Sequence, residues 1–170
     1  MSRFRTIATA AALAGTAALA VVAASAAQAS GTKAAAPWCT GDDLAIRVDD
    51  MHSPSAKDKA HVIRFVAAEG ASCRIGGTVS NLRFLDWKGE DVHAALNGRQ
   101  PPYTETLVGG DSYAAMYIAS NNEGPQQSPA FVRFNLPGQG QLGALVTVAW
   151  PASGIGAEYV RGGGIQAPVG

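Results

Sequence analysis

Two cysteines, Cys39 and Cys73, are the residues of this chain best suited to covalent chemistry. A reactive thiol needs a neighbouring histidine or cation to lower its pKa, and no spacing here places one beside Cys73. A zinc site would need the close C-x-x-C pair that the chain lacks. In an exported chain the two thiols meet an oxidising medium, where an even pair is read as a disulfide. The sequence therefore predicts a Cys39–Cys73 disulfide, with free thiols or a metal-binding pair as the alternatives.

Serine and histidine chemistry finds little support in the residue pattern. Gly109–Tyr113 reads GGDSY, but a nucleophilic serine needs a general base and oxyanion donors, and the G-x-S-x-G frame is absent. Turn-forming residues explain this run without catalysis. The histidines, His52, His61 and His93, match neither H-x-x-x-H nor H-E-x-x-H metal spacing. The sequence predicts no catalytic serine and no metal site.

Acid–base and phosphate chemistry are also disfavoured. Glu90 and Asp91 are adjacent, and adjacent residues of a strand point to opposite faces, so they cannot flank one glycosidic bond. The glycine-rich stretch RGGGIQ at Arg161–Gln166 is not followed by a helix that would help to bind phosphate. We therefore expect no enzyme activity and no cofactor.

Four aromatic residues form the candidate ligand surface. Trp87 flanks the expected hairpin tip, Tyr103 follows a Pro-Pro loop, and Tyr113 and Tyr117 share one face of an expected strand. Exposed aromatic rings can stack on sugars or anchor a protein partner. The alternative is that these rings cover the core or fill sheet edges.

The amino terminus has the three parts of an export signal. Arg3 and Arg5 precede an uncharged run rich in Ala, Leu and Val, and Ala27-Gln28-Ala29 supplies the small residues of a cleavage site. We expect a signal peptide at 1–29, a flexible leader at 30–37 and one domain at 38–170. The alternative is an uncleaved membrane anchor. Cleavage would leave the protein secreted, either extracellular or associated with the cell wall.

The charge balance and the absence of a second apolar run argue against nucleic acid and membranes as partners. The whole chain has 13 basic and 13 acidic side chains, and removal of Arg3 and Arg5 leaves 11 against 13. No basic patch points to nucleic acid. No second long apolar run follows, so we expect no stable membrane insertion after cleavage of the signal.

The part of the chain that carries these candidate residues is predicted to consist of short strands separated by Gly- and Pro-containing turns. Apolar residues alternate with polar ones, which favours half-buried strands. We expect an all-β fold, an antiparallel β-sandwich of the immunoglobulin-like type with one disulfide. The expected strands are 44–48, 61–68, 80–87, 92–96, 103–107, 113–119, 131–136, 145–150 and 158–162. The expected core is Ile46, Val48, Ile63, Phe65, Leu82, Phe84, Met116, Ile118, Val132, Phe134, Val146 and Val148.

Three stretches carry a resemblance to a known family: WCTGDDLAIRV at Trp38–Val48, CRIGGTVSNLRFLDWKGEDV at Cys73–Val92, and LVGGDSYAAMYI at Leu107–Ile118. Together they resemble a family of secreted and lipoprotein domains of unknown function, common in high-GC Gram-positive bacteria. The chain departs from that pattern at Ile75, where the family usually has Leu, and at Thr78 and Val79, where the family tends to have an aromatic residue and a proline. The resemblance implies a secreted β-sandwich with a disulfide matching Cys39–Cys73, and no known activity.

These observations favour a secreted, non-enzymatic binding module that acts in the extracellular space or the cell envelope. Its partner would be an unknown protein or a cell-wall glycan. The alternatives are a carbohydrate-binding module that uses Trp87 and Tyr103, a secreted protease inhibitor that presents the loop Ser120–Pro129, and a hydrolase.

Overall fold

A computed structural model describes residues 35–98 and 101–169. The expected signal peptide at 1–29 and the first part of the leader, 30–34, lie outside the described residues. Within the described ranges every regular element is a strand, and no helix long and apolar enough to cross a membrane is found there. The strands are β1 (Leu44–Met51), β2 (Asp58–Ala67), β3 (Ser72–Gly76), β4 (Ser80–Leu85), β5 (Glu105–Gly109), β6 (Tyr113–Asn121), β7 (Gln126–Gln127), β8 (Phe131–Pro137), β9 (Leu142–Ala149), β10 (Ile155–Gly156) and β11 (Val160–Gly162).

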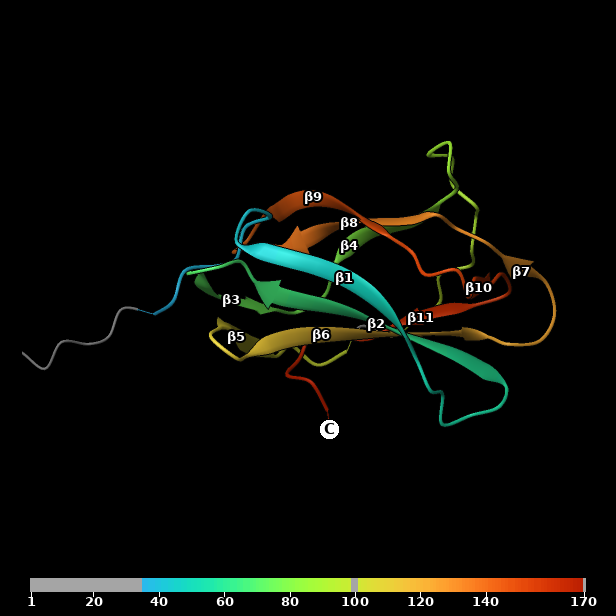
Figure 1. Ribbon diagram of the computed structural model, residues 1–170, viewed down its shortest axis with the longest axis horizontal. Helices are drawn as coiled ribbons and strands as arrows, with labels where there is room; N and C mark the ends of the chain where they lie inside the picture. The colour runs from blue at the N-terminus through green and yellow to red at the C-terminus, as the bar shows by residue number, and fades with distance from the viewer. Residues whose placement is uncertain (1–34, 99–100, 170) are drawn as a thin grey trace, which may run out of the picture. The chain divides into compact units, whose positions relative to one another are not determined.

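The strands form antiparallel sheets, so the predicted all-β class is confirmed. One sheet has the order β1-β2-β6-β11, and a second has the order β4-β8-β9. Strands β3 and β5 pair with each other, as do β7 and β10. The β4-β8-β9 sheet lies over the β1-β2-β6-β11 sheet, and the β3–β5 pair lies toward one end (Figure 1).

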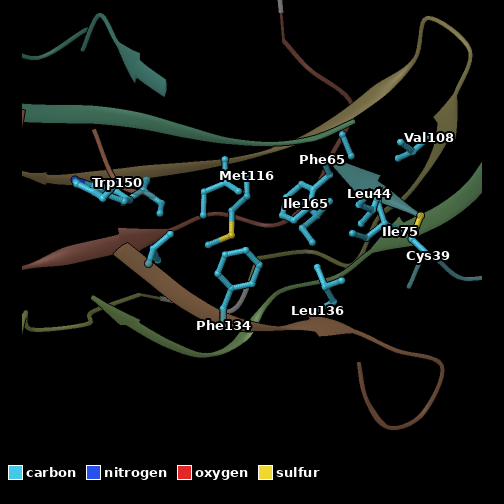
Figure 2. Packing of buried hydrophobic residues seen from close by; sticks show 14 of the residues in the cluster. Cys39, Leu44, Phe65, Ile75, Val108, Met116, Phe134, Leu136, Trp150 and Ile165 are labelled. Carbon is cyan, nitrogen blue, oxygen red and sulfur yellow. The ribbon is translucent and has the colours of Figure 1, made fainter. Parts of the chain in front are cut away.

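One hydrophobic core fills the space between the layers. Alternation along β2 and β6 turns one side of each strand inward, and β8 contributes Phe134 and Leu136 from the opposite layer. Figure 2 shows these two side chains directed toward residues that include Met116 and Ile165. All the predicted core residues belong to this cluster, some fully and some partly buried. The period-2 pattern was therefore sufficient to identify the inward faces.

Two local expectations were wrong. The predicted return strand at 92–96 is irregular: the Val92 amide donates to the carbonyl of Phe84, but His93 then adopts a φ of 55°. That left-handed conformation directs the chain away from β4, which ends the hairpin. The second error is an omission: Ser72–Gly76 is not among the expected strands, but it is strand β3, which pairs with β5, 29 to 37 positions later in register.

The predicted disulfide is present. Cys39 and Cys73 are joined, with their Cα atoms 4.9 Å apart. Both cysteines are buried at one end of the core, and the bond ties the segment before β1 to strand β3. A disulfide is compatible with the extracellular location expected from the sequence.

Candidate functional site

A polar cleft opens where the β3–β5 pair meets the hairpin between β8 and β9. Its cavity volume is about 460 Å³. We call it the aromatic cleft, because two aromatic side chains line it together with a guanidinium, one carboxylate and two amides. These residues are Trp38, Tyr103, Arg74, Glu105, Gln139 and Gln141.

The disulfide fixes the first wall of the aromatic cleft. Trp38 directly precedes Cys39, and Arg74 directly follows Cys73, so the bond holds these two lining residues side by side. Backbone hydrogen bonds add to this tie: the Arg74 amide donates to the carbonyl of Pro37 at 2.8 Å, and the Cys39 amide donates to the carbonyl of Arg74 at 3.0 Å. The Arg74 guanidinium lies 5.3 Å from the centre of the Trp38 ring, a cation–π distance.

A chain of hydrogen bonds continues from Arg74 to the second aromatic ring. Arg74 Nη1 donates to Glu105 Oε2 at 3.1 Å, and the Tyr103 hydroxyl donates to Glu105 Oε1 at 2.6 Å. The Tyr103 hydrogen bond holds the pKa of Glu105 below its usual value, and Arg74 acts in the same direction. The same bond raises the pKa of Tyr103. Glu105 is therefore a carboxylate at neutral pH, and Tyr103 keeps its proton.

Two glycines make room for this arrangement. A Cβ on Gly76 would overlap the backbone carbonyl of Thr104, so the close approach of β3 to the start of β5 requires glycine. A Cβ on Gly77 would lie 3.3 Å from the ring of Tyr103, and the backbone there has a φ of 79°. The ring of Tyr103 therefore packs against bare backbone, while 63% of the residue stays exposed.

The lining of the aromatic cleft lacks the pair of carboxyl groups that glycoside hydrolysis uses, as far as the described residues show. Glycoside hydrolysis requires two carboxyl groups, one of them protonated. Glu105 is the single carboxylate among the described lining residues, and its lowered pKa removes it as a proton donor. What remains are aromatic faces, hydroxyls, amides and one cation, which together suit a neutral polar ligand with an apolar face.

The four aromatic residues predicted from the sequence are not gathered in one place. Tyr103 lies in the aromatic cleft, whereas Trp87 stands on the turn after β4, 75% exposed, with Lys88 Nζ 5.2 Å from its ring centre. Tyr113 and Tyr117 lie on the outer face of β6, where Arg64 approaches the Tyr113 ring at 5.7 Å. Trp87 and Tyr103 therefore do not form one platform.

Of the six lining residues named above, the sequence singled out Tyr103 alone, and it missed Trp38 and Arg74 among the others. The stretch PWC places its ring beside one half of the disulfide, and the stretch CR places Arg74 beside the other half. The prediction of the disulfide thus already implied that these two side chains are neighbours.

A Ser-His-Asp cluster lies elsewhere, and sequence reasoning missed it as well. His61 Nε2 lies 3.0 Å from Ser153 Oγ, and Ser153 Oγ donates to Asp50 Oδ1 at 2.5 Å. In a catalytic triad the carboxylate accepts from the other ring nitrogen of histidine. Here the serine lies between the other two groups, and Nδ1 of His61 has no hydrogen-bond partner in the described part of the chain. The serine proton is directed to Asp50, so the cluster does not have the geometry of an activated nucleophile.

Burial lowers the pKa of His61, partly offset by the charge of Asp50. The ring is almost completely buried and lies 4.6 Å from the ring of Trp150. Lys59 Nζ donates to the carbonyl of Ser153 at 2.8 Å. These contacts fix the turn after β9 to the start of β2.

The loop proposed for protease inhibition is shorter than expected. Of Ser120–Pro129, the first two residues end β6, and Gln126–Gln127 form β7. Asn121 is buried, and its side chain accepts from the amides of Glu158 and Tyr159. What stays exposed before β7 is a compact turn at 122–125, whereas a bait loop offers an extended segment.

No family model, curated protein sequence or solved structure matches this chain. The chemistry of the described residues is therefore the basis for assigning a function.

Proposed function

We propose that this protein is a secreted, non-enzymatic binding module of the extracellular space or cell envelope, and that the aromatic cleft is its ligand site. Secretion is supported by the export signal in the sequence and by the compatibility of the Cys39–Cys73 disulfide with an oxidising medium. The single observation that carries the binding role is the hydrogen-bonded chain from Tyr103 through Glu105 to Arg74, which holds two aromatic rings at one polar cleft.

The ligand class that fits best is a neutral glycan. A sugar ring has an apolar face of C–H groups that stacks on an aromatic side chain, and a rim of hydroxyls that needs donors and acceptors. The aromatic cleft offers the Tyr103 ring for stacking, and the amides of Gln139 and Gln141 both donate and accept. Its volume of about 460 Å³ lies within the usual range of small-ligand sites.

The test measures binding of the mature chain to insoluble peptidoglycan and chitin by depletion from solution, and to their soluble oligosaccharides by calorimetry. We expect Tyr103→Ala to weaken binding by about tenfold or more, since loss of one aromatic contact costs about 1.5 kcal/mol with its buried area. Trp38→Ala should also weaken binding, because Arg74 then loses the ring that it packs on.

Trp87→Ala is the matched control, because it removes an exposed aromatic residue that does not line the aromatic cleft. Its affinity should stay within about twofold of the wild type. Loss of binding in Trp87→Ala with retention in Tyr103→Ala would move the site to the hairpin turn. Absence of binding to every glycan would reject the ligand class.

The rival functions make different predictions in the same preparations. Stoichiometric inhibition of a subtilisin-like protease would favour the inhibitor, although the turn at 122–125 lacks an extended bait segment. Turnover of an ester, glycoside or peptide substrate that is lost in Ser153→Ala would favour the hydrolase.

The immunoglobulin-like form of the sandwich is also a proposal. It is supported by two antiparallel sheets that face each other across one core. An experimental structure in which the strand order departs from the Greek-key connections of that fold would reject it.

A further inference from the structure

A second hollow lies on the outer face of the β1-β2-β6-β11 sheet. The register places Met51 opposite Ala60, Ala60 opposite Ala119, and Ala119 opposite Arg161. Directly opposed residues of antiparallel strands share a face, so these four side chains form one row across the sheet. The row faces outward, because the next residue along β2, His61, is turned into the core.

The middle of this row is a floor of two methyl groups. Ala60 and Ala119 are short, while Tyr117, two positions along β6 on the same face, is long and forms a wall. The tail of the chain fixes that wall, since the amide of Val169 donates to the Tyr117 hydroxyl at 3.0 Å. The resulting cavity has a volume of about 560 Å³, and carbon atoms supply most of its surface. We call it the alanine trough.

The two ends of the alanine trough differ in chemistry. Arg161 stands at one end, with its guanidinium 4.8 Å from the ring centre of Tyr159. In residues 35–98 and 101–169 no carboxylate lies within ion-pair distance of it, and the nearby Asp58 accepts the hydroxyl of Tyr159. Met51 and Pro54 form the other end, beside the exposed His52. The carboxylate of Asp58 also lines the trough.

We propose that the alanine trough binds a medium-chain fatty acid. The carboxylate pairs with Arg161, and the hydrocarbon chain lies across the methyl groups of Ala60 and Ala119 toward Met51. Three strand spacings separate the two ends, about 14 Å, which an extended fatty acid of roughly ten to twelve carbons spans. An unpaired guanidinium at one end of an apolar hollow matches a ligand with one anionic end and an apolar body.

This site is independent of the aromatic cleft, since the two share no lining residue. A failure of the glycan proposal therefore leaves the fatty-acid proposal standing, and the reverse also holds.

The test uses the full mature chain at about pH 8, where a fatty acid is ionised, and calorimetry with dodecanoate below its micelle-forming concentration. We expect saturable binding of one molecule, about tenfold weaker binding of dodecanol, and affinity that rises roughly fourfold for each two carbons from octanoate to dodecanoate, as partial burial of each added methylene requires.

Variants locate the site. Arg161→Gln should remove the preference for dodecanoate over dodecanol, and Ala119→Leu should abolish binding of both by filling the trough. Ala60→Val is a second variant that fills the trough, and a β-branched residue is well tolerated in a strand. It can be tested if Ala119→Leu does not fold. Arg133→Gln, a change in the other layer, is the matched control and should bind as the wild type does.

Three outcomes would overturn the proposal. One is the absence of saturable binding at every chain length. Another is equal affinity for dodecanoate and dodecanol in the wild type. The third is unchanged binding in folded Ala119→Leu or Ala60→Val, which would indicate adsorption elsewhere on the surface.

Discussion

Opening the Cys39–Cys73 disulfide should lower the stability of the whole domain and loosen one wall of the aromatic cleft. The bond closes a loop with a sequence separation of 34 residues. On the chain-entropy account, freeing a loop of that length lowers the free energy of unfolding by about 3.8 kcal/mol. Both cysteines are buried, so chemical reduction, which keeps the sulfur atoms in place, isolates the cross-link better than replacement by alanine does.

The expected shift in melting temperature follows from the size of the domain, which runs from Ala35 to Gly170. At about 2.1 cal/mol/K for each residue, unfolding carries an entropy of roughly 0.29 kcal/mol/K. A loss of about 3.8 kcal/mol then lowers the melting temperature by about 13 °C. Cys39→Ala/Cys73→Ala should lose somewhat more, because it also deletes buried sulfur contacts.

The assay is denaturant unfolding of oxidised and reduced protein, followed by hydrogen exchange of the reduced protein under native conditions. The Arg74 amide, which donates to the carbonyl of Pro37, and the Cys39 amide, which donates to the carbonyl of Arg74, should exchange faster after reduction. Amides in the pairing of β2 with β6 should change only as much as global stability does. Unchanged unfolding midpoints, or full protection of the Arg74 amide in the reduced protein, would refute the reasoning.

Two further predictions concern titration and backbone packing. The free energy of unfolding should fall as pH drops below about 6.5, because burial lowers the pKa of His61 in the folded state and the unfolded chain then binds one more proton. Urea unfolding at a series of pH values should show a slope of at most about 1.4 kcal/mol per pH unit. In His61→Gln that slope should flatten. A slope that persists unchanged in the variant would assign the effect to another group. Thermal melts should show that Gly76→Ala destabilises the domain by more than about 2 kcal/mol, because the added Cβ would overlap the carbonyl of Thr104. Gly41→Ala is the control: its Cβ would make an ordinary contact at 3.4 Å, so the stability should stay within about 1 kcal/mol of the wild type.

The sequence pattern was reliable where strand alternation alone decides the outcome. The inward residues of β2, β6 and β8 follow from period-2 alternation, and they form the core. The pattern was unreliable for segments whose structure depends on pairing with a strand far away in sequence. Strand β3 contains a cysteine and a glycine and has no strong strand pattern of its own, but pairing with β5 makes it a strand. The segment 92–96 has the pattern of a strand, yet the φ of His93 takes it away from β4.

The candidate sites were harder to anticipate for a related reason. Tyr103 was singled out as an exposed aromatic residue, but its partners Arg74 and Trp38 come from a strand and a leading segment far away in sequence. From the sequence, only the predicted Cys39–Cys73 disulfide indicates that those two segments are neighbours. Trp87, by contrast, was visible in the sequence as an aromatic residue at a turn, but it does not line the aromatic cleft.

Hydrophobic alternation predicts which way a side chain points, but the depth of a surface depends on the sizes of residues that meet across strands. Ala60 and Ala119 are separated by 59 positions and become neighbours only through the register of β2 with β6. The aromatic cleft depends in the same way on Gly76, whose missing side chain admits the backbone before Glu105. Small residues at matched positions therefore create both hollows. At Ala60 and Ala119, which face outward, larger residues would leave the strands and the core unchanged, whereas at Gly76 a side chain would overlap the backbone of β5. It follows that filling the alanine trough should remove its ligand without unfolding the sheet, which is why the variants at Ala60 and Ala119 separate binding from stability.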